Sequence, residues 1–413
     1  MDNNNSIGDD NLSPTLKCQT ILAERKLQGL EVYDFGLGAN PIPQPSVYIN
    51  ALKKYAHRKE YTSCEGIAPL NNIIKNMYKK TTIERFTDFN YDVLVGNGLK
   101  ELIFILQYAF KGKIFHINPS WVSYREHIKI MNREKDLVEI NTSLSSGYNI
   151  NPRDLDSSFE KYKEHPKIII LNSPNNPLGT YITRTQLETL ANIFRKHNCI
   201  VISDEIYLNL AFDGECHSIS EFIPELTIRC TSVSKDMGCG GYRIGWAAFP
   251  QTLRDFYIQC KMFSSCIYSC APTPLQYATY EMLQDTVSFK RHCKMSVHVY
   301  RTIVEHVCNV LRDSNITFVR PNASWYVFLN FDYYKNKLSE NGIFDSNSLC
   351  LYLIKTIGFI CVSGNAFNVD GLNIRISLVD FSVDIDEKSG IVNFDYTRIT
   401  IGLRKLIILL NTL

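Results

Sequence analysis

The chain has 413 residues, of which 45% are hydrophobic and 21% charged, and its 44 Lys and Arg nearly balance its 42 Asp and Glu. A chain of this length exceeds the size at which one hydrophobic core keeps growing, so two domains and a cleft site are expected. The balanced charge gives no footprint for nucleic acid or for an anionic membrane surface. The sequence has no apolar run of about 18 residues and therefore predicts no membrane span.

The N-terminal residues 1–15 are polar and acidic, and they are expected to form a disordered tail. They lack the basic and apolar regions of a signal peptide. The 13 cysteines are scattered, with no C-x-x-C pair of the kind that metal sites use. The sequence therefore predicts reduced thiols, a cytoplasmic protein and no metal site.

From about residue 90 to 250 the sequence alternates between apolar strands and amphipathic helices, which is the pattern of parallel β-α-β units. Tyr91 to Val95 is predicted to be a strand that runs into Gly96-Asn-Gly98. A helix over 99–110 follows, and 113–117 is predicted to be the next short strand.

The clearest unit begins with Lys167-Ile-Ile-Ile-Leu171, a β-branched run typical of a buried parallel strand. A capping box at Thr183 and Gln186 then predicts the start of a helix that carries apolar residues on one face. Two further strands are expected at 199–203 and 226–231.

Towards the C-terminus the pattern changes to a long helix followed by extended segments such as 316–319 and 325–331. This change predicts a smaller α+β domain of residues 16–45 and 291–413, beside a large domain of residues 46–290. The predicted fold class is α/β, with a mostly parallel central sheet in the large domain.

Polar residues follow the ends of the predicted strands, which is where open parallel sheets bind ligands. Asp204 comes directly after strand 199–203, and Lys235 lies just past strand 226–231. A buried carboxylate such as that of Asp204 could keep the ring nitrogen of a pyridine cofactor protonated.

The segment around Lys235 combines groups that could hold a phosphate. It places the hydroxyls of Ser232 and Ser234, a glycine-rich turn and the guanidinium of Arg243 around one amine. Such a group could bind a phosphate while the amine of Lys235 condenses with an aldehyde.

Other residues are placed to contact the same cofactor. Tyr207 and Asn176 could donate hydrogen bonds to the phenolic oxygen of its ring, and Trp121 could stack on the ring face. The helix that begins at Leu99 offers backbone N–H groups to the phosphate, after Gly98 has let the chain approach closely.

Four segments together resemble those of the fold-type I pyridoxal-phosphate enzymes, the class I/II superfamily of aspartate aminotransferases. In order, they are Asn172-Ser-Pro-Asn-Asn-Pro-Leu-Gly179, Ser203-Asp-Glu-Ile-Tyr207, Ser232 to Gly245 and Leu372-Asn-Ile-Arg-Ile-Ser377. The resemblance covers about residues 30 to 410 and implies the fold of type I pyridoxal-phosphate transferases. It also implies pyridoxal 5'-phosphate as the cofactor. Leu178 departs from the family, which usually has threonine there.

The resemblance implies a role for each site residue. Lys235 is implied as the lysine that carries the cofactor as an imine and shuttles the proton, with Asp204 and Tyr207 as its catalytic partners at the ring. The implied cofactor ligands are Gly98, Leu99, Lys100, Trp121, Asn176, Asp204, Tyr207, Ser232, Ser234, Lys235 and Arg243, with Tyr61 reaching from the neighbouring subunit of a homodimer. The implied substrate ligands are Arg375, which would clamp the α-carboxylate, Asn176 and Gly38.

The expected reaction is a ping-pong transfer of an amino group between an amino acid and a 2-oxo acid. Lys100 matches a lysine that faces the distal carboxylate of the substrate in some aspartate and prephenate aminotransferases, which favours a dicarboxylic donor such as aspartate. A lysine in the first turn of a helix is also commonly solvent-facing.

One alternative function remains open from the sequence, and a second is disfavoured. A pyridoxal-phosphate lyase of the aminocyclopropane-carboxylate synthase or carbon-sulfur lyase type would share the ring-binding residues. A cofactor-binding regulator is disfavoured, because about 45 residues before the catalytic pattern are too few for a DNA-binding module.

Overall fold

The computed structural model describes residues 14–81, 89–214, 216–386 and 391–413. The chain forms two compact units: unit 1 comprises Met1–Pro41, Thr302–Pro321 and Trp325–Leu413, and unit 2 comprises Ile42–Arg301 and Asn322–Ser324. Residues 1–13 of the expected tail lie outside the described residues, and the last two residues of that tail, Pro14 and Thr15, begin helix α1. The domain limits expected from the sequence stay a prediction.

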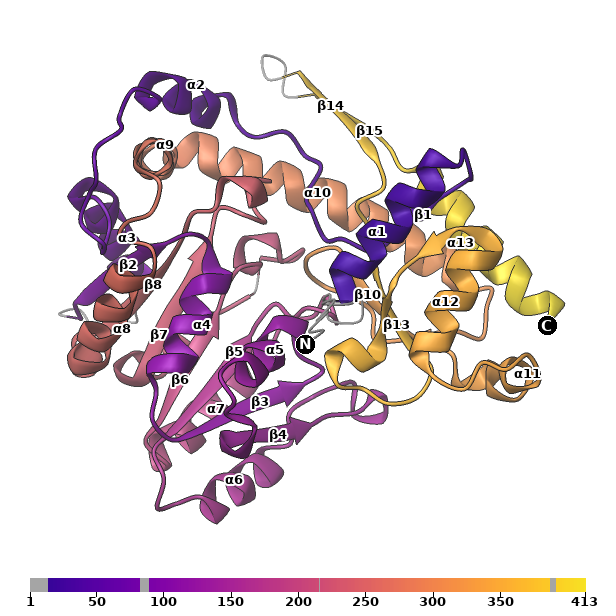
Figure 1. Ribbon diagram of the computed structural model, residues 1–413, viewed down its shortest axis with the longest axis horizontal. Helices are drawn as coiled ribbons and strands as arrows, with labels where there is room; N and C mark the ends of the chain where they lie inside the picture. Colours follow the sequence, from indigo (N-terminus) through magenta and orange to yellow (C-terminus); the bar gives the residue numbers. More distant parts are fainter. Residues whose placement is uncertain (1–13, 82–88, 215, 387–390) are drawn as a thin grey trace, which may run out of the picture. The chain divides into compact units, whose positions relative to one another are not determined.

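Unit 2 is built on a seven-stranded sheet of order β2-β8-β7-β6-β5-β3-β4 (Figure 1). Its strands are β2 (Tyr91–Gly96), β3 (Lys113–Asn118), β4 (Leu137–Asn141), β5 (Lys167–Asn172), β6 (Cys199–Asp204), β7 (Thr227–Ser232) and β8 (Gly245–Pro250). The neighbours from β7 to β4 pair in parallel, whereas β8 runs antiparallel to both β2 and β7. The expected α/β fold with a mostly parallel sheet is therefore confirmed.

Helices cover both faces of this sheet, and the side chains of each strand point alternately to one face and the other. Ile168 and Ile170 of β5 belong to a core cluster with α4 and α8, while Ile169 and Leu171 belong to another cluster with α6 and α7. The helices around the sheet are α4 (Leu99–Ala109), α5 (Val122–Ile130), α6 (Pro152–Lys161), α7 (Arg184–Lys196) and α8 (Arg254–Ile267). Burial on two sides explains why β5 is apolar throughout.

The edge of the sheet at β2 and β8 packs on a third core cluster, to which three further helices contribute two or more buried residues each. These are α2 (Ser46–Tyr55), α3 (Ala68–Thr81) and α9 (Thr273–Gln284). Helix α7 begins as the sequence predicts, with Thr183 as its N-cap and Gln186 completing the capping box. The strand expected from residue 226 begins one residue later, because Leu226 ends a short 3-10 turn.

Unit 1 contains a four-stranded antiparallel sheet of order β12-β13-β10-β9, together with two small two-stranded sheets. The strands of unit 1 are β1 (Tyr33–Asp34), β9 (Thr317–Phe318), β10 (Tyr326–Asn330), β11 (Phe359–Ile360), β12 (Val362–Ser363), β13 (Asn373–Ser377), β14 (Ser382–Asp386) and β15 (Ile391–Asp395). Its helices are α1 (Pro14–Leu27), α11 (Lys335–Glu340), α12 (Ser346–Ile357) and α13 (Thr397–Thr412), and the long helix α10 (Thr286–Leu311) contributes residues to both units.

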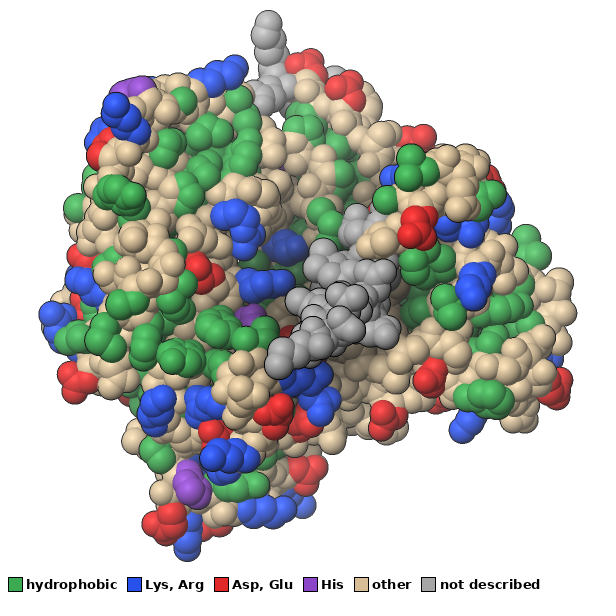
Figure 2. Space-filling view, in the orientation of Figure 1, with side chains coloured by type: hydrophobic (Ala, Val, Ile, Leu, Met, Phe, Trp, Pro, Cys, Tyr) green, Lys and Arg blue, Asp and Glu red, His purple; other side chains and the backbone are tan. Residues whose placement is uncertain are grey.

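Within the described ranges, no helix combines the length and the apolar character that a membrane crossing requires. On the face of the molecule that Figure 2 shows, basic and acidic side chains are interspersed, in keeping with a formal net charge of +2.

Candidate active site

Lys235 lies in the connection between β7 and β8, and this connection is closed at its base by the pairing of Ser232 with Gly245. Inside it, the amide of Gly238 donates to the carbonyl of Lys235 at 3.4 Å, and the amide of Ser234 donates to Oγ of Ser232 at 3.1 Å. The segment is therefore a loop anchored on two neighbouring strands; it carries the predicted Lys235, Ser234 and Arg243, and Ser232 ends the strand before it.

Arg243 is held against the start of α4. Its guanidinium donates to the carbonyl of Gly240 at 2.8 Å and to that of Asn97 at 3.1 Å. Gly98, the N-cap of α4, has a φ of +85° and no room for a side chain, because a Cβ there would collide with the guanidinium of Arg243. The predicted glycine is thus required both by its backbone conformation and by the close approach of Arg243.

The first turn of α4 also packs closely on β8. A Cβ at Gly245 would lie 2.8 Å from the amide nitrogen of Leu99. No side chain caps the N-terminus of α4. Arg243 and the amide end of the helix therefore lie beside Ser232, which combines a guanidinium, a hydroxyl and a helix N-terminus in the manner of phosphate sites.

Asp204 is the last residue of β6 and is only 3% exposed. The hydroxyl of Tyr124, on α5, donates to its Oδ2 at 2.5 Å, and the amide of Ile206 donates to its Oδ1 at 3.2 Å. Burial raises the pKa of the Asp204 carboxyl to about 6, against the lowering effects of these two donors and of the nearby charge of Lys235. The lysine and the acid predicted from the sequence therefore lie in one electrostatic environment.

Asn176 is tied to Asp204 through a residue that the sequence did not single out. The side chain of Asn172 donates to the backbone carbonyl of Asp204 at 3.1 Å and accepts from the amide of Asn176 at 2.8 Å. Tyr207, three residues after Asp204, is buried as well, at 3% exposure. Asn172, Asp204 and their loops therefore form one connected group at the ends of β5 and β6.

Trp121 and Lys100 meet at the edge of this group. The amine of Lys100 lies 5.2 Å from the centre of the Trp121 ring, and the Trp121 ring meets that of Tyr124 edge-on, with centroids 5.4 Å apart. Burial lowers the pKa of Lys100, and the positive charges of Arg243 and Lys235 lower it further. Three cationic side chains are thus gathered where an anionic ligand would be stabilised.

Arg375 and Gly38 belong to unit 1 and are described there by themselves. Arg375 lies in the centre of β13, is 4% exposed, and its guanidinium stacks 4.8 Å from the ring of Tyr326 and 5.3 Å from that of Phe367. It also donates to the carbonyl of Gly36. Gly38 leaves no room for a side chain, because a Cβ there would collide with the hydroxyl of Tyr326.

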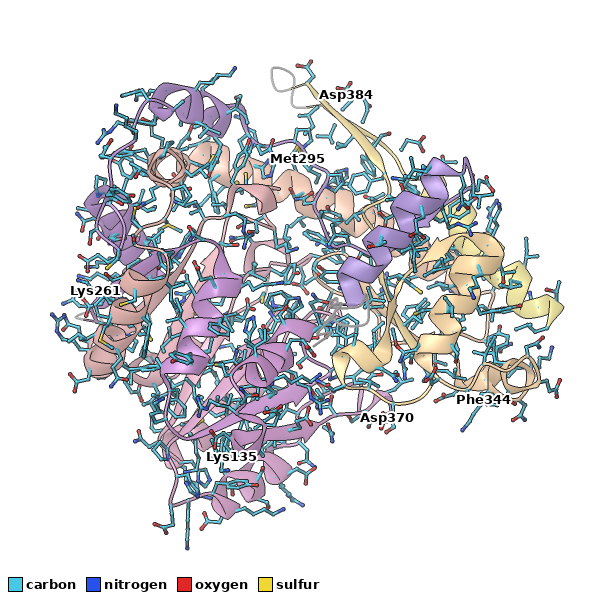
Figure 3. The ribbon with its side chains drawn as sticks, viewed as in Figure 1. Lys135, Lys261, Met295, Phe344, Asp370 and Asp384 are labelled. Atoms are coloured by element: carbon cyan, nitrogen blue, oxygen red, sulfur yellow. The ribbon has the colours of Figure 1, made fainter. Side chains whose placement is uncertain are left out.

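Tyr61 stands apart from the strand-end group. Its side chain is 88% exposed. The segment that follows it is fastened to α8, where Glu65 forms an ion pair of 2.6 Å with Lys261, a residue labelled in Figure 3.

Sequence reasoning missed Tyr124 and Asn172, the two side chains that hold Asp204. Trp121 is the N-cap of α5 and lies outside the helix, so no helical spacing connects Tyr124 with it.

The residues present fit an aldehyde cofactor that carries a pyridine ring and a phosphate. The amine of Lys235 and the buried carboxyl of Asp204 are the two groups that such a ring requires. The narrow space between Gly98 and Arg243 admits only backbone, so the helix amides of α4 can approach a phosphate. The donor set is therefore suitable for pyridoxal 5'-phosphate.

Comparisons with known proteins agree with this reading. The family profile described as aminotransferase class I and II matches residues 30–382. The asparagine–oxo-acid transaminase of Streptococcus mutans is 27% identical and the aspartate aminotransferase of Bacillus subtilis 25% identical, and each alignment covers 91% of this chain and 94% of the relative. The structure of aspartate aminotransferase from Thermus thermophilus with maleate has the same fold, with a TM-score of 0.82, 22% identity and 96% coverage of both chains.

Proposed function

Because the chain belongs to the class I and II aminotransferase family and is therefore a pyridoxal-phosphate-dependent aminotransferase, we propose that it transfers amino groups between a dicarboxylic amino acid and a 2-oxo acid at Lys235. The observation that carries this proposal is the grouping of Lys235, Asp204 and Arg243 at neighbouring strand ends of one sheet. Both relatives named above are transaminases, so the lyase alternative is not favoured.

The cofactor would be held at its two ends. Ser232, Ser234 and Arg243, with the amides of Gly98, Leu99 and Lys100, would bind its phosphate, while Asp204 would receive a hydrogen bond from its ring nitrogen. When bound, pyridoxal phosphate supplies an electron-accepting ring that stabilises the negative charge left by removal of the substrate's α-proton.

The other side chains position the reactants. The amine of Lys235 would accept the α-proton of the amino acid as a general base and would later donate it back as a general acid. Asn176 and Tyr207 would donate hydrogen bonds to the ring oxygen, and Trp121 would cover one ring face. Burial of Tyr207, Asn176 and Asp204 supports these roles, since each can then keep one orientation.

Arg375 would bind the α-carboxylate of the substrate as a bidentate pair, with Gly38 and Asn176 completing the substrate site. The rings of Tyr326 and Phe367 hold the Arg375 guanidinium in place before the substrate arrives. This lowers the entropy lost on binding a carboxylate.

Lys100 would select the dicarboxylic donor. The charges of Arg243 and Lys235 that lower its pKa make an added anion favourable beside it. A distal carboxylate at this place would form a charge-assisted hydrogen bond with the Lys100 amine. Substrates with an uncharged side chain would lack this bond.

The enzyme would act as a homodimer in the cytoplasm. On α8, Ile258 and Met262 are 50% and 55% exposed and one turn apart, and the Glu65–Lys261 ion pair holds the segment of Tyr61 on the same helix. We call Ile258 and Met262 the α8 patch; such exposed apolar groups support burial by a second copy. Each cysteine whose side chain the structure describes is a free thiol, which suits a reducing compartment.

The test combines cofactor trapping with steady-state kinetics. Borohydride reduction of the holoenzyme followed by peptide mapping should fix the cofactor on Lys235, and K235A should retain no label and lose transamination. Initial rates with an amino acid and a 2-oxo acid should give parallel double-reciprocal lines, as expected for a ping-pong mechanism. Label on another lysine, or intersecting lines, would contradict the proposal.

A further inference from the structure

Tyr124 is a buried residue of α5 whose contact with Asp204 has so far been described only as a hydrogen bond. It is 2% exposed, and its hydroxyl donates to Oδ2 of Asp204 at 2.5 Å. The other carboxylate oxygen of Asp204 accepts the amide of Ile206. Two donors on separate oxygens leave the Asp204 carboxylate with one favoured rotation about its Cβ–Cγ bond.

The hydrogen bond from Tyr124 opposes the rise that burial causes in the pKa of Asp204. Glu205 adds a like charge and Lys235 an opposite one, while Tyr207 and Cys230 face the same pair. A buried carboxylate needs such donors to stay ionised.

The ring on the other side of Tyr124 contributes no charge. The His116 ring lies 5.9 Å from that of Tyr124, and burial lowers the pKa of His116 to about 3, so it is neutral near pH 7. Its Nε2 forms a hydrogen bond of 3.0 Å with Oε1 of Gln107. His116 therefore adds no positive charge beside the Tyr124 hydroxyl.

We propose that Tyr124 is a positioning residue whose hydroxyl keeps the Asp204 carboxylate ionised. The same hydrogen bond would orient the carboxylate so that its other oxygen can accept a hydrogen bond from the ring nitrogen of the cofactor. The inference rests on the proposed function and adds a residue to it. A merely structural tyrosine would satisfy its hydroxyl on any neighbour, as Tyr48 does with Thr279 at 2.9 Å.

The experiment compares Y124F with the matched control Y48F, since each loses one buried hydroxyl that forms one hydrogen bond. In the apoprotein, the Asp204 carboxyl is titrated by infrared difference spectroscopy against D204N. Its midpoint should rise in Y124F, because the ionised form loses a donor, and should not move in Y48F.

The second readout is the dissociation constant of pyridoxal phosphate from each purified apoprotein. We expect Y124F to bind about tenfold or more weakly, from the loss of one hydrogen bond to a charged group. In the D204N background, Y124F should weaken binding no further, since it acts through Asp204. Y124H, which keeps a ring N–H donor, should recover part of the affinity and serves if Y124F does not fold.

An unmoved Asp204 midpoint in Y124F, or equal weakening with and without Asp204, would overturn the role of Tyr124 while the proposed function stands. Failure of the wild-type apoprotein to bind pyridoxal phosphate would instead overturn the proposed function. The apoprotein titration still decides in that case whether the Tyr124 hydroxyl controls Asp204.

Discussion

At the scale of single residues, the site uses burial to prepare charged groups. Asp204 at the end of β6 and Asp236 next to Lys235 both have pKa values that burial raises to about 6. Near neutral pH these pKa values reduce the stability of the apoprotein, because the buried carboxyls ionise without a positively charged group bound directly to them. The cofactor's ring nitrogen would provide that partner for Asp204.

The pKa of Asp204 leads to a prediction for stability. Because the folded state binds this proton more tightly than the unfolded chain, the stability from this group is complete below about pH 4 and is lost as the pH rises through about 6. We expect D204N apoprotein to match the wild type near pH 4 and to exceed it near neutral pH by up to about 3 kcal/mol. Urea unfolding at both pH values measures this. A difference that does not change with pH would refute the assignment.

Lys100 gives a prediction for specificity. K100A should raise KM for aspartate roughly tenfold to a hundredfold, through loss of a hydrogen bond between charged groups, and should leave an uncharged amino acid almost unaffected. Steady-state rates with both donors measure this. K111A is the matched control, because Lys111 also places its amine over an aromatic ring, that of Tyr108 at 5.7 Å, beyond the other end of α4. Equal effects of K100A on both donors would end the assignment.

At the scale of elements, β6 and β7 are joined beneath the site by an ion pair. Glu205 and Arg229 are each 3% exposed, with 2.7 Å between Oε2 and Nη2. Ser218 and Ser203 also donate to Glu205, at 2.5 and 3.0 Å, and the Arg229 guanidinium lies 4.0 Å from the Tyr78 ring centre. The residue next to Asp204 is thus fixed on several sides.

Breaking this pair should be costly. E205Q leaves the guanidinium of Arg229 buried without its counter-charge, so we expect a loss of about 3–5 kcal/mol in the free energy of unfolding. Replacing both partners with apolar residues, in E205L/R229M, should recover part of this loss. The exposed pair of Arg195 with Glu225 is the control, and E225Q should cost about 0–1 kcal/mol. If E205Q and E225Q unfolded at the same urea concentration, the buried pair would contribute no more to the free energy of unfolding than the exposed pair.

The elements also show what a sequence can predict. Strands such as β5 and β6 were predicted correctly because burial on two faces demands continuous β-branched residues. Two strands of the same sheet were missed. In β8, Gly245-Trp-Ala-Ala-Phe-Pro250 has no β-branched residue, and β4 is a partly exposed strand at the edge of the sheet.

The candidate site follows the same division. Lys235, Asp204 and Arg243 were predicted because motifs place them at strand ends, and the structure brings their charges together. Tyr124 could not be paired with Asp204 from the sequence, because the two lie 80 residues apart and meet only when α5 folds over the sheet. Local patterns predict elements and loops, whereas contacts between distant elements need the fold.

At the scale of the whole molecule, the proposed assembly makes a prediction. I258E and M262E should each place a charge in the α8 patch and shift the protein from dimer to monomer, which sedimentation velocity measures. I130E is the control, because Ile130 is 68% exposed and lies outside the patch. If Tyr61 reaches the neighbouring site, the monomers should also bind the cofactor more weakly. Variants that remain dimeric would place the interface elsewhere.

The register of three strands has a consequence for how this enzyme could diversify. Gly96, Gly245 and Ser232 stand side by side on β2, β8 and β7, so the connection that carries Lys235 and Arg243 is clamped at both of its ends. An insertion or deletion inside it would move the amine relative to the guanidinium. Laboratory evolution towards new amino donors should therefore accept changes around Lys100 and in unit 1, and should leave the length of this clamped connection untouched.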